Sequence, residues 1–338
     1  MKRCSRITLF RCILIYNRTK YLCRWWLGCV VTKIGLIGLS EGNGHPYSFS
    51  SIINGYNDKF LEESGWDVIH NYVKKRDISE FGLGNARITH VWTQDLNISQ
   101  NIARACNIKN VVTSYQEMLG EIDALIIARD DFENHYQMAI DFLEADIKVF
   151  IDKPLTCSIK ELKLFKKYLL KGQLMSVAGL RFAMELDDVR SNINTFGKLK
   201  FIQSSVIMNW EKYGIHIIDA VLGTLDDKPF SIEYIKSDAQ FYLVHFESGL
   251  VWTINVLGSV PKTFNIEFWG EENRRSVEIE DNFTMFRRML YRFVQMVEHG
   301  EVLHKPEDTI LSIALLIAGN KSEIENRKVY LKEVIDEL

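Results

Sequence analysis

An alternation of buried strands and helices in the first half of the chain limits the fold more than any other feature. The segment KIGLIGL, residues 33–39, is a continuous apolar run typical of a parallel strand that is buried on both faces. Glycine-rich SEGNGHPYS follows, and Pro46 suits the first turn of a helix over 46–56. The same strand-then-helix pattern continues to residue 182. It predicts a doubly wound parallel sheet with right-handed crossovers.

The remaining elements divide the chain into two domains. Further strands of the first sheet are expected at 86–95, near 111–112, and at 122–130, 148–154 and 174–182, with helices at 98–106, 133–145 and 158–171. After Gly197 the segments 198–210, 230–238, 239–248, 250–258 and 263–271 follow in succession, several of them alternating apolar with polar residues, which indicates an antiparallel sheet with one covered face. Helices are expected at about 214–224, 282–298 and 306–325. The fold class is therefore α/β: a Rossmann domain over 33–155, and an α+β domain over 156–338 with an open, mainly antiparallel sheet. Helix 158–171 and strand 174–182 are expected to pack with the first sheet.

The first 32 residues differ from the rest of the chain. They contain seven Lys or Arg, no acid, and four of the six cysteines. Basic residues interrupt every candidate h-region of a secretory signal, and no apolar run reaches the roughly 20 residues of a membrane span. A basic membrane-surface helix or a transit segment remains open, but we expect this leader to lie outside the working fold, with a true start near Val30 or Val31.

Composition excludes several classes of protein for the body of the chain. Hydrophobic residues make up 47% and charged residues 25%, as in soluble globular proteins. Without the leader the net charge of −3 becomes about −10, which argues against nucleic-acid binding. Only Cys106 and Cys157 remain, so neither a disulfide framework nor a metal site is indicated. A cytoplasmic location and no membrane contact of the folded body are expected.

The turn GLIGLSEGNGH is a degenerate match to the dinucleotide fingerprint G-x-G-x-x-G. Gly38 and Gly42 stand near the expected glycine positions, whereas Ser40 occupies the second. The turn follows the first buried strand and opens a helix, whose N-terminus attracts phosphate. We therefore expect Gly38, Leu39, Ser40, Gly42 and Asn43 to bind a dinucleotide, the alternative being a glycine-rich turn without a ligand.

The end of the second strand does not indicate which dinucleotide is preferred. An acid usually binds the ribose hydroxyls there, but this strand ends in WTQD. Thr93 takes the usual acidic place and Asp95 lies two residues beyond it. Both are cofactor-binding candidates, and the choice between NAD and NADP stays open.

Two further segments carry candidate chemistry. VFIDKPLTCS, residues 149–158, places Lys153 at the carboxyl end of a strand, where open α/β sheets bind ligands, although a solvated surface ion pair is the simpler alternative. EKYGIHIIDAVLG, residues 211–223, places His216 and Asp219 three residues apart on one helix face. A lone histidine on such an apolar helix is more often a core residue than a catalyst.

Taken together, these two segments resemble the Gfo/Idh/MocA oxidoreductases, the NAD(P)-dependent sugar and cyclitol dehydrogenases related to glucose–fructose oxidoreductase and inositol dehydrogenase. DKP is similar to the family's Glu-Lys-Pro after a strand, and GIHIIDAVLG to its Gly-x-His-x-x-Asp on a helix of the second domain. ALIIARDDFENH is similar to the family's strand, loop and histidine, with His135 at the histidine. The resemblance covers residues 33–338.

The resemblance implies hydride transfer at a carbinol carbon, with NAD or NADP as the cofactor. Lys153 would bind the reacting hydroxyl as base or polariser, His216 would contact the same hydroxyl or relay its proton, and Asp219 would orient substrate hydroxyls or the imidazole. Arg181 is either a substrate contact or an inter-domain ion pair. The other implied contacts are cofactor contacts from Ala128, Arg129, His135, Asp152 and Lys153, and substrate contacts from Tyr213, His216 and Asp219.

This chain departs from the family pattern at three places. Asp152 replaces Glu, Ser40 replaces a glycine, and the ARDDFENH loop is more acidic than the usual Thr-Pro type. NAD-dependent glycoside cleavage on the same scaffold and a non-catalytic nucleotide or sugar sensor remain alternatives. The resemblance further implies a sugar-like small-molecule substrate and a homodimer or homotetramer formed through the outer sheet face.

Overall fold

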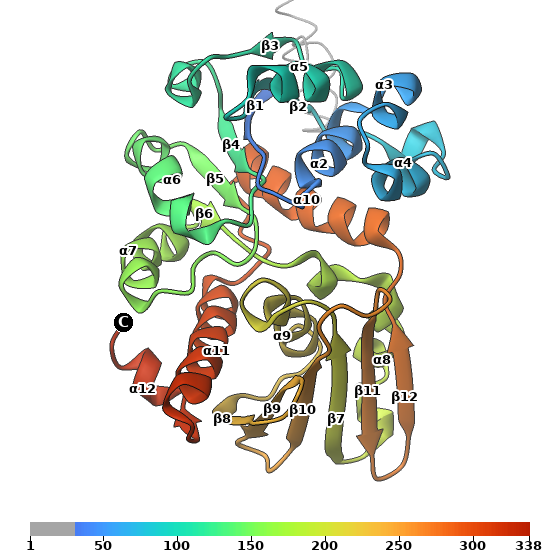
Figure 1. Ribbon diagram of the computed structural model, residues 1–338, viewed down its shortest axis with the longest axis vertical. Helices are drawn as coiled ribbons and strands as arrows, with labels where there is room; N and C mark the ends of the chain where they lie inside the picture. The colour runs from blue at the N-terminus through green and yellow to red at the C-terminus, as the bar shows by residue number, and fades with distance from the viewer. Residues whose placement is uncertain (1–30) are drawn as a thin grey trace, which may run out of the picture.

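The computed structural model describes residues 31–338, and it contains two sheets stacked along the long axis of the molecule (Figure 1). The first sheet is parallel throughout, with six strands in the order β3-β2-β1-β4-β5-β6. Its strands are β1 (Thr32–Ile37), β2 (Ala86–Trp92), β3 (Asn110–Val111), β4 (Ala124–Ile127), β5 (Lys148–Ile151) and β6 (Leu174–Met175). This order confirms the predicted doubly wound fold. Residues 1–30 of the predicted basic leader lie outside the described part of the chain, and its last residue, Thr32, belongs to β1 and pairs with Ala86, so the fold begins earlier than the predicted bound of 33.

Helices lie on both sides of the first sheet. In Figure 1, α6 and α7 lie on one side and α2 on the other. The helices of this domain are α2 (His45–Asn54), α3 (Asp58–Glu62), α4 (Asp67–Val73), α5 (Leu96–Ala105), α6 (His135–Glu144) and α7 (Ile159–Leu170). Helices α3 and α4 have no counterpart in the sequence-based prediction.

Strand β6 is much shorter than the predicted strand 174–182. Only Leu174 and Met175 pair with β5, and Gly179–Phe182 forms a 3₁₀ turn, η5, instead. A Cβ on Gly179 would lie 2.7 Å from the ring of Phe286, so the chain packs closely against a helix there rather than against a neighbouring strand. The segment after β6 is therefore the passage from the first sheet to the second.

The second sheet is mixed and mostly antiparallel, with seven strands in the order β12-β11-β7-β10-β9-β8-β13. Strands β7 and β10 are the parallel pair. Its strands are β7 (Leu199–Val206), β8 (Pro229–Ile235), β9 (Gln240–Phe246), β10 (Val251–Val256), β11 (Phe264–Gly270), β12 (Arg274–Glu278) and β13 (Val329–Tyr330). The five predicted strands are found, and β12 and β13 extend the sheet at its two edges.

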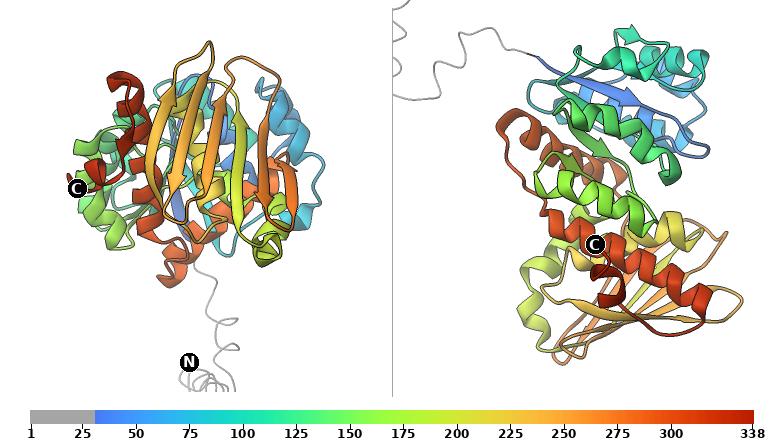
Figure 2. Two further views of the ribbon diagram at one scale, coloured as in Figure 1. Left: turned by 90° about the horizontal axis from the view of Figure 1, so that it is seen from below. Right: turned by 90° about the vertical axis from the view of Figure 1, so that its left-hand side faces the viewer.

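Helices cover only one face of this second sheet. Helices α9 (Ile215–Leu222) and α11 (Pro306–Glu325) lie on the inner face, while no helix of residues 31–338 covers the outer face (Figures 1 and 2). Residues in β7, β9 and β10 alternate between buried and partly exposed, as expected for a sheet with one covered face. The remaining helices of this half are the short α8 (Asp187–Ser191) and α12 (Lys332–Ile335).

Helix α10 (Asn282–His299) returns from the second sheet to the first domain. It crosses the middle of the molecule in Figure 1 and contacts α2, β5 and η5. Phe293 on α10 lies 5.7 Å from the ring of Phe150 on β5, which in turn lies 6.1 Å from Phe49 on α2. These aromatic contacts tie α10, which follows the second sheet, to β5 and α2 of the first domain.

Two general properties follow from the described residues. No helix within 31–338 has the length and apolarity needed to cross a membrane. Within the same range, no group of three or more His, Cys, Asp or Glu side chains is arranged to hold a metal ion.

Candidate active site

The carboxyl ends of the first sheet's strands and the start of α9 border a single cavity of about 190 Å³. Lys153 reaches it from the end of β5, and Tyr213 and His216 reach it from the second domain. Gly42, Asn43 and Gly44 of the glycine turn close one side. The two sequence segments that carried the family resemblance therefore meet at one place.

Lys153 is almost fully buried at this edge, with 5% of its surface exposed. Its ammonium lies 3.9 Å from Asp130 Oδ2 and 5.7 Å from the centre of the Tyr213 ring. A buried ammonium needs a counter-charge, and Asp130 supplies one. This is not the exposed ion pair that the simpler reading of DKP allowed.

His216 has no hydrogen-bond partner among the described residues, and its Nδ1 is fully buried without one. Its ring lies 5.4 Å from Tyr213 and 5.5 Å from Phe264. Burial and then the neighbouring charge of Lys153 hold the pKa of His216 well below its usual value. At neutral pH the imidazole is therefore uncharged and has a free nitrogen, which suits a proton acceptor.

Asp219 does not orient His216. Its carboxylate accepts hydrogen bonds of 2.6 Å from the backbone N–H of Ala178 and from the hydroxyl of Ser312. Burial raises the pKa of Asp219, and Arg181, 3.9 Å away, opposes that effect. Asp219 thus joins α9 to the passage after β6 and to α11, which places it behind the cavity rather than beside the reacting atoms.

Asp152 organises the glycine turn. Its carboxylate accepts a 2.5 Å contact from His45 Nδ1 and a hydrogen bond from the Asn43 side chain, and its other oxygen accepts from the backbone N–H of Lys153. Burial alone would raise the pKa of Asp152, but His45, Lys153 and Asn43 outweigh burial and hold it well below its usual value. The shorter Asp therefore replaces the family's Glu as a buried, ionised anchor.

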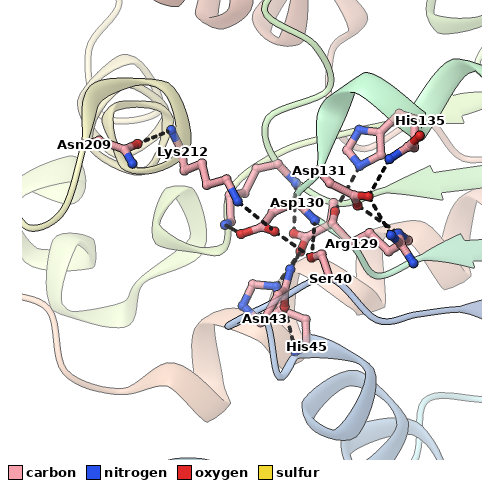
Figure 3. Close-up of polar contacts among 12 residues, drawn as sticks. Ser40, Asn43, His45, Arg129, Asp130, Asp131, His135, Asn209 and Lys212 are labelled. Carbon is pink, nitrogen blue, oxygen red and sulfur yellow. Dashed lines mark hydrogen bonds and ion pairs between the residues drawn. The ribbon is translucent and has the colours of Figure 1, made fainter. Parts of the chain in front are cut away.

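Asp130 connects the two domains across the cavity (Figure 3). Its Oδ1 accepts a 2.6 Å hydrogen bond from Ser40 and lies 3.6 Å from the ammonium of Lys212, while its Oδ2 faces Lys153. Sequence reasoning missed His45, Asp130 and Lys212. Their signals were the unusual acidity of ARDDFENH, the His-Pro that ends the glycine turn, and the lysine that precedes Tyr213.

The glycine turn retains the features of a phosphate cradle. Within residues 31–338 the backbone N–H groups of Glu41, Gly42 and Gly44 donate no hydrogen bond, and the first turn of α2 carries no acid. Gly42 has φ +74° and open space where a Cβ would stand. Free N–H groups at a helix N-terminus favour an anion, so the turn fits a diphosphate although Ser40 replaces a glycine.

The predicted cofactor residues at the end of β2 form hydrogen bonds within their own part of the fold. Thr93 is buried and bonds Ser99 and the carbonyl of Asp95, and the exposed Asp95 caps α5 by accepting from the N–H of Asn97 through one carboxylate oxygen. Gln94, which the sequence reading passed over, donates to the carbonyl of Leu39 and accepts from Arg129.

The loop after β4 is held by two of its own residues. Arg129 pairs with Asp131 and donates to the carbonyl of Gly38 and to the side chain of Gln94, so it lies beside the first strand's end without lining the Lys153 cavity. His135 is fully buried, with its ring nitrogens 3.0 Å from the carbonyls of Leu155 and Arg129. Ala128 is buried in the core. His135 and Ala128 support the loop rather than face the cavity.

Of the two alternatives for Arg181, a substrate contact or an ion pair, the structure shows an ion pair. Its Nη2 donates to Asp308 at 2.5 Å, and the side chain lines a different cavity from the one that holds Lys153. Tyr213, by contrast, lines the Lys153 cavity as predicted for a substrate contact. Of these two candidate substrate contacts, Tyr213 lines the cavity that holds Lys153 and Arg181 does not.

Fold and site together define a protein with a dinucleotide-binding Rossmann domain and a mixed-sheet second domain that closes the crevice. Residues 68–178 match the sequence model of the GFO_IDH_MocA family, described as "Oxidoreductase family, NAD-binding Rossmann fold". This match, over about a third of the chain, agrees with the resemblance to the Gfo/Idh/MocA oxidoreductases. The match includes Asp152, Lys153 and Pro154 and begins after the glycine turn. No curated protein sequence matches the chain.

Solved structures share the fold over most of the chain. A myo-inositol dehydrogenase from Lactobacillus casei in complex with NAD(H) and myo-inositol is 16% identical, with a TM-score of 0.70, and the alignment covers 89% of this chain and 97% of that one. A scyllo-inositol dehydrogenase from the same organism with bound NAD(H) and scyllo-inositol is 14% identical, with a TM-score of 0.69 over 89% and 99%. A myo-inositol 2-dehydrogenase from Lactobacillus plantarum is 15% identical, with a TM-score of 0.70 over 89% and 99%. At these identities the likeness concerns the fold.

Proposed function

We propose that this protein is an NAD(P)-dependent oxidoreductase that transfers hydride between the nicotinamide and a hydroxyl or keto carbon of a sugar, cyclitol or nucleotide-sugar derivative. The convergence of Lys153 and His216 on one cavity, beside an anion-binding glycine turn, carries the proposal. The bound inositols of the fold neighbours are polyhydroxylated rings of the same chemical class.

The dinucleotide would be held mainly by the glycine turn. The free N–H groups of Gly42 and Gly44 suit its diphosphate, and Gln94 and Arg129 bind the carbonyls of Leu39 and Gly38 in the same turn. When bound, the nicotinamide supplies the hydride acceptor or donor. The chain's own residues must then orient the alcohol, move its proton and exclude water.

Lys153 and His216 divide the proton chemistry. Lys153, paired with Asp130, is placed to donate a hydrogen bond to the reacting oxygen and polarise it. His216, neutral and without a hydrogen-bond partner among the described residues, is placed to accept the hydroxyl proton in oxidation and to return it in reduction. Phe264, Phe286 and Met285 line the same cavity and keep water away from the exchange.

We also propose that the protein works as a homodimer or homotetramer. The bare outer face of the second sheet carries partly exposed apolar side chains, including Phe201, Phe241, Leu243 and Val251. A sheet face of this size and composition suits burial against a second copy. Sedimentation velocity would measure the assembly directly, and a monomer at micromolar concentration would contradict this part of the proposal.

The catalytic assignment is tested by replacing the two lysines that face Asp130. Lys153→Met should lower kcat by about 10²–10⁴-fold, the range for a positioned proton-transfer group, in assays that follow nicotinamide absorbance with a panel of sugars, cyclitols and nucleotide sugars. Lys212→Met is the matched control. It removes an ammonium from the same carboxylate, but its side chain is 38% exposed and it does not line the cavity, so kcat should stay within about 10-fold.

Three outcomes would contradict the proposal. Equal losses in the two variants would remove the special role of Lys153. Release of free sugar from a glycoside without net NADH would indicate glycoside cleavage on the same scaffold. Tight nucleotide or sugar binding with no turnover on any member of the panel would favour the sensor alternative.

A further inference from the structure

A second cavity, of about 330 Å³, lies between η5, α8, α10 and the loop before α11. It is distinct from the catalytic cavity: Leu180 lines the catalytic cavity, whereas the next residue, Arg181, lines this one. We call it the arginine cavity because four guanidinium groups border it, those of Arg181, Arg190, Arg288 and Arg292.

Positive charge exceeds negative charge in this cavity. Lys305 adds a fifth cation to the four arginines, whereas Asp187 and Asp308 are the two carboxylates in the lining. Asp187 is shared, since it accepts from Arg190 at 3.1 Å and from Arg288 at 2.8 Å. Asp308 is occupied by Arg181. Three positive charges thus remain without a matching carboxylate in the lining.

Arg292 is the least satisfied of these cations. Its Nε is buried without a partner, and no carboxylate in the described chain lies within ion-pair distance of its guanidinium. Its one close contact is with the ring of Phe182, 4.8 Å away. Burial, and then the charges of Arg181 and Arg288, lower the pKa of Arg292. Such crowding of like charges is unfavourable unless an anion joins them.

Arg181 also has a hydrogen-bond donor without an acceptor. Its Nη1 is buried without a hydrogen bond and has the carboxylate of Asp219 3.9 Å away, while its Nη2 binds Asp308. Arg288 and Arg292 lie four residues apart on α10, so they project from one face of that helix. Planar guanidinium groups from η5, α8 and α10 therefore converge on a space whose two carboxylates do not balance their charge. Guanidinium donors match the oxygens of phosphate better than those of neutral ligands.

We propose that the arginine cavity binds a small phosphate dianion, either free phosphate or the phosphate group of a monoester. A volume of about 330 Å³ lies at the small end of ligand sites, which fits a phosphorylated monosaccharide and excludes a dinucleotide. A phosphate group carries up to two negative charges and accepts several hydrogen bonds, which matches the three unbalanced cations and the free donors of Arg181 and Arg292. The site is independent of the proposed oxidoreductase activity.

The test is isothermal titration of the full-length protein with inorganic phosphate, with a hexose phosphate and with the unphosphorylated hexose, at constant ionic strength in chloride. We expect binding of phosphate, of the hexose phosphate, or of both, and any binding of the hexose itself, at the catalytic cavity, should be the same in wild type and Arg292→Gln. Tighter binding of the ester would identify a phosphorylated metabolite as the ligand, and equal binding would identify free phosphate. Arg292→Gln should weaken binding by about 10-fold or more.

Arg274→Gln is the matched control, because the Arg274 guanidinium also lies over a ring, 5.0 Å from that of Trp269, but is exposed and outside the cavity. It should leave phosphate affinity unchanged. Thermal unfolding provides a second readout: phosphate should raise the melting temperature of the wild type more than that of Arg292→Gln. No phosphate or ester binding by the wild type, or equal behaviour of the two variants, would overturn the proposal.

Discussion

The catalytic cavity and the arginine cavity lie next to each other along η5, but their charges are arranged in opposite ways. Beside the catalytic cavity Asp130 faces Lys153 and Lys212, Asp152 contacts His45, and Lys262 is a further cation in the lining. In the arginine cavity two carboxylates serve five cations. A site whose carboxylates offset most of its cations keeps its electrostatic field low until ligands arrive, whereas a site with a larger excess of cations already favours an anion. The difference suggests proton transfer on one side of η5 and anion binding on the other.

Asp152 should give the largest effect on the balanced side. Asp152→Asn replaces a fully buried carboxylate that binds His45, Asn43 and a backbone N–H, so the free energy of unfolding should fall by about 2–3 kcal/mol. Urea unfolding at neutral pH measures it. The matched control is Asp188→Asn, since Asp188 contacts Arg275 at the same 2.5 Å but is exposed, and its loss should leave stability unchanged.

The contribution of Asp152 should also depend on pH in one direction. Because its folded-state pKa lies below the unfolded value of about 3.9, its stabilisation is complete well above that pH and is lost as the pH falls below it. The difference between wild type and Asp152→Asn should therefore be constant from about pH 5 to 8 and shrink below about pH 4. A difference that stays constant into that acid range would show that the carboxylate's charge is not what stabilises the turn.

Removing Asp130 should make the catalytic cavity resemble the arginine cavity. Asp130→Asn leaves Lys153 and Lys212 without their shared carboxylate, so an anionic dinucleotide should bind about 5-fold more tightly, as expected for one charge pair worth about 1 kcal/mol at 4 Å in water. Titration of NADH by fluorescence measures it. Glu133→Gln, an exposed acid on the same loop, is the control. Weaker NADH binding by Asp130→Asn would mean that Asp130 holds the cofactor site open rather than opposing the anion.

The sequence predicted the fold and the meeting of two motifs, but not the contacts between loops. Apolar runs and helix periodicity are local, so the strands, α9, α10 and α11 could be read directly. Asp130, His45 and Lys212 belong to three different elements. Only the folded chain brings Lys212 to Asp130 and His45 to Asp152. Asp219 was predicted to orient the substrate or the imidazole because spacing shows which residues share a helix face, not which neighbour meets that face.

The departures from the family pattern have a common structural explanation. Ser40 replaces a glycine and the β4 loop is acidic, and the two changes meet in the hydrogen bond from Ser40 to Asp130. Each substitution alone weakens the resemblance, whereas together they form one connection between the glycine turn and the β4 loop. Sequence reasoning treated them separately because they lie 90 residues apart.

Titration of NADH against the wild type and Gly42→Val tests the central claim, that the glycine turn and Lys153 border a dinucleotide site. Gly42 has φ +74° with open space at its Cβ position, so valine would strain the turn and fill the cradle while leaving the core untouched. The account predicts saturable NADH binding by the wild type and at least about 10-fold weaker binding by Gly42→Val, with similar melting temperatures without ligand. Absence of NADH binding by the folded wild type, or equal affinity in the variant, would contradict it.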